Sequence, residues 1–243
     1  MNDHELAAAL AAEAGALLLE IRSQGGDAGD AMANRLLLRR LAEERPRDAV
    51  LSEEAADDRV RLGRDRVWIV DPLDGTREYG EPPRADWAVH VALAIDGVAA
   101  IGAVALPGMD VVLHTGTPPV VPAAHAGPPR LVVSRSRPPK SVALVVERLG
   151  ATTIPMGSAG AKAMAVVRGE ADVYVHSGGQ YEWDSCAPVA VAESAGLHTS
   201  RIDGTPLRYN MPDPYLPDLV ICRPELAGAV LESLSGSIES SRR

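Results

Sequence analysis

The pattern of hydrophobic and polar positions changes its period several times along the first 129 residues. Over residues 4–22 apolar side chains recur every three or four positions, which predicts an amphipathic helix. A second helix is predicted after the glycines at 25–26, with Asp30 as its N-cap and Pro46 beyond its end. Short runs of apolar, β-favouring residues then predict strands at 50–51, 68–70, 87–95, 98–106 and 111–115. The last three should form an antiparallel meander that turns at Asp96-Gly97 and serves as scaffold.

After the proline-rich residues 117–129 the pattern becomes one of alternating strands and helices, as in α/β structures. It predicts strands at 131–133, 152–154, 172–176 and 219–222, and helices at 139–149, 157–168, 185–195 and 224–234. Pro188 is placed in the first turn of its helix because proline has no N–H group. We therefore predict an α+β protein with an N-terminal α+β half (1–129), a C-terminal α/β half (130–234) and a disordered tail (235–243).

Composition narrows the functional classes. The chain has 243 residues, 46% of them hydrophobic, and a net charge of −9, which argues against a nucleic-acid partner. Cys186 and Cys222 lie far apart with no C-x-x-C spacing, as is typical of a reducing compartment. Acidic residues stand where a signal peptide needs Lys or Arg, and no apolar run reaches membrane-spanning length. We expect a cytoplasmic protein with no membrane partner.

Candidate chemistry gathers around residues 68–76, where an apolar strand leads into Asp71-Pro72-Leu73-Asp74-Gly75-Thr76. A tight turn over Pro-Leu-Asp-Gly would let the carboxylates of Asp71 and Asp74 converge, and two such charges need a cation between them. Oxygen ligands with no His or Cys nearby suit Mg²⁺, and bound metal ions let an acidic protein take a phosphate ester. The alternative is a strand followed by a turn whose acids are merely solvated.

Two further acids favour the metal hypothesis. Glu53 follows a short apolar strand and lies 18 residues before Asp71, so two strand ends could present both acids together. Asp184 stands at a predicted helix start, where it could equally be an ordinary N-cap. We take Glu54 as a neighbour that faces solvent or supports the site from outside it. The metal site is thereby predicted in the N-terminal half, completed by one acid from the C-terminal half.

Three motifs in order resemble the inositol monophosphatase superfamily of lithium-sensitive, Mg²⁺-dependent phosphatases: S-E-E at 52–54, D-P-L-D-G-T at 71–76 and E-W-D-S-C-A-P at 182–188. The resemblance implies a layered αβαβα fold in two halves. It also implies one Mg²⁺ on Glu53, Asp71 and the Leu73 carbonyl, and a second on Asp71, Asp74 and Asp184. The backbone amides of Gly75 and Thr76 would then meet the phosphate. Family members are often dimers, which leaves a homodimer open.

Within this superfamily the C-terminal half resembles the CysQ branch of 3′-phosphoadenosine 5′-phosphate phosphatases. The resemblance rests on Ser134-Arg135-Ser136, Gly157-Ser158-x-x-x-Lys162 and Pro206-Leu207-x-Tyr209-Asn210. It implies substrate contacts by Ser134, Arg135, Gly157, Ser158, Lys162 and Asp184. Gly157 and Ser158 at a helix N-terminus would offer free N–H groups and Lys162 a positive charge, unless Lys162 is an ordinary solvated lysine.

Two departures from the family pattern concern the edges of the site. A lysine usually precedes the acid that matches Asp30, but this chain has no lysine before Lys140, which bears on a mobile loop at 23–30 and on any third metal ion. Arg137 stands where nucleotidases often carry a histidine that contacts the base. The expected cofactor is therefore two Mg²⁺ ions, with a third left open.

The resemblance implies hydrolysis by a water that one Mg²⁺ activates, with Glu53, or Thr76 relayed to Asp30, taking its proton. The expected substrate is 3′-phosphoadenosine 5′-phosphate, converted to AMP and phosphate. Inositol monophosphates and fructose 1,6-bisphosphate are the alternative substrates for the same site. Haloacid-dehalogenase phosphatases are disfavoured because they separate their two acids by one residue, D-x-D, whereas Asp71 and Asp74 are separated by two. A metal-dependent module that binds phosphate ligands without catalysis is the alternative outside enzymes.

Overall fold

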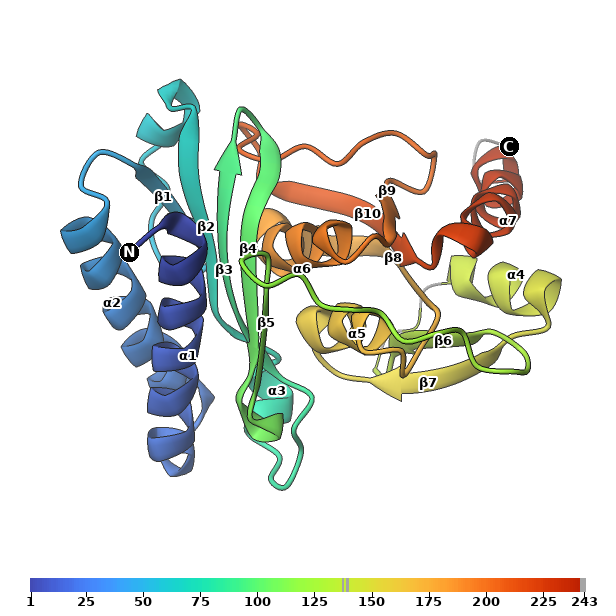
Figure 1. Ribbon diagram of the computed structural model, residues 1–243, viewed down its shortest axis with the longest axis horizontal. Helices are drawn as coiled ribbons and strands as arrows, with labels where there is room; N and C mark the ends of the chain where they lie inside the picture. Colours follow the sequence, from blue (N-terminus) through green and yellow to red (C-terminus); the bar gives the residue numbers. More distant parts are fainter. Residues whose placement is uncertain (137, 139, 241–243) are drawn as a thin grey trace.

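The computed structural model describes residues 1–136, 138 and 140–240, and within them the chain forms two stacked sheets (Figure 1). The first sheet has the strand order β1-β2-β3-β4-β5. Its strands are Ala49–Ser52, Arg66–Asp74, Ala88–Ile95, Val98–Leu106 and Val111–His114. The second sheet has the order β7-β6-β8-β10-β9. Its strands, from β6 to β10, are Arg130–Ser134, Thr152–Met156, Val173–Tyr181, His198–Ser200 and Tyr215–Cys222.

Helices cover both outer faces and fill the space between the sheets, which gives the expected αβαβα layers (Figure 1). The outer pair on the first sheet is α1 (Asp3–Ile21) and α2 (Gly26–Glu44). The inner pair is α5 (Ala159–Val167) and α6 (Glu182–Ser194), and the outer pair on the second sheet is α4 (Lys140–Leu149) and α7 (Ala227–Ser240). The short α3 (Thr76–Tyr79) directly follows β2. None of the described helices combines the length and the apolar character needed to cross a membrane.

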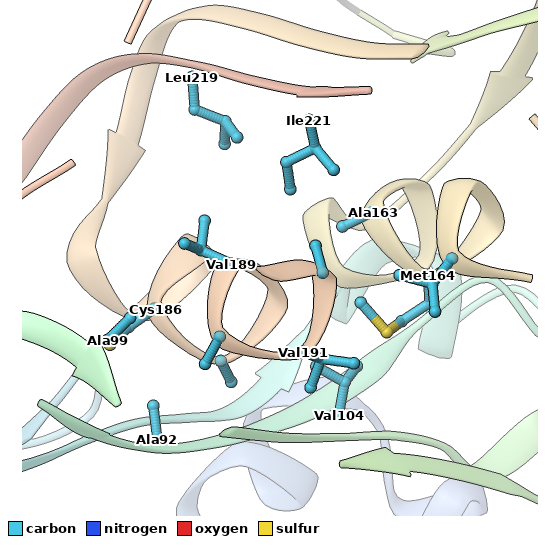
Figure 2. Close-up of a cluster of buried hydrophobic side chains, with 14 of the residues drawn as sticks. Ala92, Ala99, Val104, Ala163, Met164, Cys186, Val189, Val191, Leu219 and Ile221 are labelled. Atoms are coloured by element: carbon cyan, nitrogen blue, oxygen red, sulfur yellow. The ribbon is translucent and has the colours of Figure 1, made fainter. Parts of the chain in front are cut away.

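The largest core lies between the sheets, where small side chains let the inner helices approach closely. Figure 2 shows Val189 and Val191 of α6 and Ala163 and Met164 of α5 packed between residues of both sheets. A Cβ at Gly102 of β4 would lie 2.6 Å from the Ala187 carbonyl oxygen, so glycine lets α6 rest on the first sheet. This packing carries the first turn of α6 to the end of β2.

The meander is confirmed, but the expected turn after residue 70 is wrong. The strands from β2 to β5 pair antiparallel, while β1 pairs with β2 in parallel. β2 does not end at Val70; it continues to Asp74, with a break in its register to β3 between Asp71 and Asp74. The chain turns only at Gly75, whose φ of +88° is open to glycine at little cost. Pairing with β3 outweighs the local preference of Pro-Leu-Asp-Gly for a turn.

Three further expectations are corrected in the C-terminal half. Helix α6 begins at Glu182, three residues earlier than predicted, so Pro188 lies in the second turn rather than the first. The short β9 was not predicted at all. The tail expected to be disordered is helical as far as Ser240, because α7 is fixed by buried residues such as Val230 and Leu234 and extends past them at little cost per residue. Residues 241–243 of that tail lie outside the described part.

Candidate active site

Three carboxylates from two elements meet where β2 ends. Oxygen atoms of Asp71, Asp74 and Asp184 all lie within 4.8 Å of one another. Asp71 and Asp74 come from the last residues of β2, and Asp184 comes from the first turn of α6. Asp184 is not an N-cap, as it could have been; it is the third helical residue, and its Oδ2 accepts a hydrogen bond of 2.7 Å from the Tyr181 N–H.

Glu53 reaches the same region through the parallel pairing of β1 with β2. Ser52 is in register with Val70, and the Glu53 N–H donates to the Val70 carbonyl at 3.3 Å. Glu53 as a whole residue is exposed and lies outside the cluster of three acids. Partial burial of its carboxylate, followed by the charge of Asp30, nevertheless raises its pKa to about 7. The structure thus brings Glu53 beside Asp71, as expected from two neighbouring strand ends.

The electrostatics of these acids fit a site for divalent cations. Burial, followed by the charge of Glu53, raises the pKa of Asp71 well above its ordinary value. Burial, followed by the charge of Asp74, raises the pKa of Asp184 to about 7. Carboxylates buried together without a cation resist ionisation, and a hard cation with oxygen ligands relieves that repulsion. The residues present therefore fit Mg²⁺, and the Leu73 carbonyl follows two residues after Asp71.

Asp74 is the exception, because protein groups already stabilise its charge. Its Oδ1 accepts the Ala159 N–H at 3.1 Å and its Oδ2 accepts the Gly160 N–H at 2.6 Å, both from the start of α5. His90 of β3 places its Nε2 atom 3.2 Å from Oδ2. Burial alone would raise the pKa of Asp74, but the His90 contact and the Gly160 amide hold it below its ordinary value. One carboxylate of the cluster is thus kept ionised by the fold.

The prediction that Gly157 and Ser158 offer free N–H groups is wrong. The Gly157 N–H donates to Asp86 Oδ2 at 2.6 Å, and the Ser158 N–H donates to the Asp86 carbonyl at 3.2 Å. The next two amides bind Asp74, as described above. The start of α5 is therefore occupied by aspartates of the protein itself, which sequence could not reveal because Asp74 and Asp86 come from the other half.

Asp30 is not the N-cap of α2, because that helix starts earlier, at Gly26. Asp30 is instead the fifth residue of this helix, and its side chain points toward Thr76. The Thr76 hydroxyl lies 3.1 Å from Asp30 Oδ2 and 3.2 Å from the Leu73 carbonyl, and its single proton goes to one of them. Burial and the charge of Glu54 raise the pKa of Asp30 to about 7, and its Oδ1 is buried without a hydrogen-bond partner.

A cavity of about 590 Å³ opens from the acids toward the second sheet, and it brings together most of the predicted substrate-binding residues. Its lining includes Gly75, Thr76, Ser134, Gly157, Ser158, Lys162 and Asp184. Arg135 does not line it. The guanidinium of Arg135 instead pairs with Glu78 at 2.6 Å and with Glu81 at 2.7 Å, and so joins α3 to the end of β6.

Lys162 lines the cavity but is far from the solvated lysine that was the alternative. Its side chain is buried, and its ammonium donates to the carbonyls of Gly157 and Ser158, the second at 2.7 Å. The ammonium also lies 5.4 Å from the centre of the Tyr174 ring. Burial lowers the pKa of Lys162. It therefore holds the segment at 157–158 in place and brings an amine into the cavity lining.

The P-L-x-Y-N segment lies behind the site rather than in the cavity lining. The Tyr209 hydroxyl is 3.3 Å from Ser185 Oγ of α6, and the Asn210 and Met211 N–H groups both donate to Glu182 at 2.7 Å. The Asn210 side chain accepts a hydrogen bond of 2.9 Å from the buried Arg61. The segment therefore braces the turn that carries Asp184.

Sequence reasoning missed other residues near the acids. Arg77, Glu78, His176 and Gln180 line the cavity, and His90 contacts Asp74. The signal for His90 was available, because it is the one residue of Ala88–Ile95 that is not apolar. The assignment of the meander to scaffold alone overlooked it. Arg137, expected near a base, lies outside the described residues.

Comparison with known proteins decides the family. The model of the inositol monophosphatase family matches residues 10–239. The chain belongs to the inositol monophosphatase family. Within it, the chain is 51% identical to a 3′-phosphoadenosine 5′-phosphate phosphatase of Mycobacterium leprae, over 95% of this chain and 93% of that protein. A protein of the same name from Mycobacterium tuberculosis is 52% identical, over 92% and 90% of the two chains.

Solved structures of the family have the same fold. The crystal structure of CysQ from Bacteroides thetaiotaomicron superimposes with a TM-score of 0.79 at 27% identity, covering 90% of this chain and 96% of that one. The αβαβα arrangement expected from the resemblance is thereby confirmed.

Proposed function

We propose that this chain is a Mg²⁺-dependent, lithium-sensitive phosphatase that removes the 3′-phosphate of 3′-phosphoadenosine 5′-phosphate to give AMP and phosphate. The observation that carries the proposal is the convergence of Asp71, Asp74 and Asp184 at one end of a polar cavity. Relatives with that name share about half of their residues with this chain over nearly its whole length. Their name supplies the substrate, and the geometry supplies a reason why phosphate chemistry fits here.

The ligand sets are those that the family resemblance implies, and the meeting of Asp71, Asp74 and Asp184 supports them. Glu53, Asp71 and the Leu73 carbonyl would hold one Mg²⁺, and Asp71, Asp74 and Asp184 would hold a second. When bound, the ions supply the positive charge that a phosphate dianion needs among carboxylates, and they acidify the attacking water. Without them a phosphate would meet only negative charge at this end of the cavity.

The residues of the chain then have separate tasks in proton transfer. Glu53 at the rim is one acceptor for the proton of the attacking water, since its raised pKa suits proton transfer near neutral pH. The Thr76 hydroxyl, which lies within 3.1 Å of Asp30, offers a second path that ends on a buried carboxylate. The amides of Gly75 and Thr76, at the turn after β2, would orient the phosphate. No covalent intermediate is required.

The cavity also accounts for a substrate with two phosphates. A volume of about 590 Å³ is well within the range of small-molecule sites. Its lining includes the cations Arg77 and Lys162, the second bound to the Gly157 carbonyl. A second phosphate would be attracted to these charges, whereas inositol 1-phosphate has none to offer. Ser134 and Gln180, both in the lining, add hydrogen-bonding groups for the nucleoside.

Product analysis tests this proposal. Purified protein with Mg²⁺ should convert 3′-phosphoadenosine 5′-phosphate into AMP and one equivalent of phosphate, as separated by anion-exchange chromatography. Asp184→Asn should lower kcat by at least about 10³-fold, the scale of losing a main electrostatic stabiliser. Asp65→Asn makes the same change at an exposed residue and should leave kcat unchanged. Release of the 5′-phosphate, or full turnover in EDTA, would contradict the proposal.

A further inference from the structure

His90 is a buried histidine in contact with the cluster of acids. It lies in the middle of β3, directly opposite Asp71 in the sheet, and its side chain is fully buried. Its Nε2 atom is 3.2 Å from Asp74 Oδ2, a close contact too bent for a well-formed hydrogen bond. Its Nδ1 atom is 2.9 Å from the Trp183 carbonyl oxygen and 4.0 Å from Asp71 Oδ2.

These contacts assign the two ring nitrogens to different partners. A carbonyl oxygen only accepts hydrogen bonds, so Nδ1 must carry a proton and donate it to Trp183. The opposite nitrogen then faces the carboxylate of Asp74. Trp183 immediately precedes Asp184 in the first turn of α6. The ring therefore connects a ligand at the end of β2 with the backbone next to a ligand on α6.

The surrounding chain leaves room for this ring and for little else. A Cβ at Gly160 would overlap His90 Nε2, so α5 can approach only because position 160 has no side chain. The same glycine donates its N–H to Asp74 Oδ2 at 2.6 Å. The amide thus holds this carboxylate oxygen by a hydrogen bond while the ring packs against it at 3.2 Å, and such outer contacts orient the ligands of metal sites.

We propose that His90 is a positioning residue for the second metal ion, which sets the distance between Asp74 and Asp184. The inference rests on the ligand sets of the proposed function, in which those two acids serve the second ion alone. The first ion takes Glu53, Asp71 and the Leu73 carbonyl, and the only close approach of His90 to these in the described structure is 4.0 Å to Asp71, which the two ions share. Loss of the ring should therefore lower the affinity for the second ion and leave the affinity for the first ion unchanged.

Two substitutions separate the two contacts of the ring. In His90→Asn the amide takes the place of Nδ1 and keeps the bond to Trp183 but loses Asp74. In His90→Gln the longer side chain places its amide nitrogen near the position of Nε2 and keeps the contact with Asp74. The matched control is His4→Asn on α1, a histidine whose Nδ1 atom contacts Thr115 Oγ1 at 2.7 Å, outside the site.

The measurement is binding of Mn²⁺ and Mg²⁺ to the substrate-free protein, with free Mn²⁺ counted by electron paramagnetic resonance and heats by titration calorimetry. Wild type and His4→Asn should bind two ions. His90→Asn should bind one ion as in wild type and the other about 10–100-fold more weakly, the usual effect of losing a partner of a metal ligand. His90→Gln should regain most of that loss.

Each other outcome overturns the inference. Unchanged affinity for both ions in His90→Asn would show that the ring positions nothing. Equal weakening of both ions, with a lower melting temperature and no rescue in His90→Gln, would assign it to general packing. Wild type that binds fewer than two ions would refute the ligand sets themselves, and with them the metal chemistry of the proposed function.

Discussion

In EDTA, which removes metal ions, the free energy of unfolding of the protein should fall as the pH rises from about 5 to 8. The reason lies in acids whose pKa is raised in the folded state. Burial raises the pKa of Asp30 and of Asp184 to about 7, against an ordinary value of 3.8. Between those values the folded protein binds protons that the unfolded chain has lost, so the free energy of unfolding falls as pH rises. Above about pH 7 the effect is complete.

The size of the effect follows from a single buried acid. A pKa raised from 3.8 to about 7 spans roughly three units. At 1.36 kcal/mol per unit this amounts to about 4 kcal/mol. Because the acids share their protons, we take one group's shift as the contribution of the cluster. Of this, the two units between pH 5 and pH 7, about 2.7 kcal/mol, are lost across the measured range. A protein of this size loses about 2–4 °C in melting temperature per kcal/mol, so the melting temperature should fall by about 5–11 °C between pH 5 and pH 8.

Thermal melts followed by circular dichroism at pH 5, 6, 7 and 8 measure this, with EDTA or with excess Mg²⁺. Mg²⁺ binds the ionised acids of the folded state and should remove most of the loss at pH 8. Asp184→Asn should flatten the pH dependence in EDTA, whereas Asp65→Asn, an equal charge change at an exposed site, should not. A melting temperature in EDTA that is flat or rises from pH 5 to 8 would refute the reasoning.

Three further predictions concern activity. Asp30→Asn should lower kcat more than it raises KM, because Asp30 accepts from the Thr76 hydroxyl and lies away from the cavity lining; steady-state kinetics that show a full kcat would leave it a structural acid. Lys162→Ala should raise KM for the bisphosphate nucleotide by about 10-fold, the scale of one charge-assisted hydrogen bond, since the change removes positive charge and loosens residues 157–158. An equal rise in KM for inositol 1-phosphate would contradict that assignment. Li⁺ should inhibit turnover at constant Mg²⁺. If the residual turnover of Glu53→Gln, which keeps Asp71, Asp74 and Asp184, shows the same inhibition curve as wild type, Li⁺ acts at the second ion's site. Turnover that is insensitive to Li⁺ would contradict the proposal.

Local sequence patterns were sufficient for most elements and for the neighbourhood of the acids. The apolar runs at 87–95 and 98–106 and the Asp96-Gly97 turn between them led directly to β3 and β4. The sequence also predicted that two strand ends present Glu53 and Asp71 together, and the parallel pairing of β1 with β2 brings them there. These inferences depend on contacts between residues that are close in the chain or on adjacent strands.

The parts that sequence could not supply depend on packing between the two halves. The Gly160 amide reaches Asp74 across 86 positions, and the Trp183 carbonyl reaches His90 across 93. Nothing local marks the N–H groups at the start of α5 as already bound, so the sequence alone predicts them to be free for a phosphate. Asp30 was read as a cap because its residue type suits one, whereas its place inside α2 is fixed by the earlier start of that helix at Gly26.

The most direct test of the central claim is kcat/KM for released phosphate, measured with Mg²⁺ on three substrates: 3′-phosphoadenosine 5′-phosphate, inositol 1-phosphate and fructose 1,6-bisphosphate. The acids of β2 and α6 should hydrolyse all three to some extent, and the cavity with Arg77 and Lys162 should favour the nucleotide. We expect the highest kcat/KM for 3′-phosphoadenosine 5′-phosphate. A higher value for either of the other two would contradict the substrate, and no phosphate from any of them would contradict the phosphatase itself.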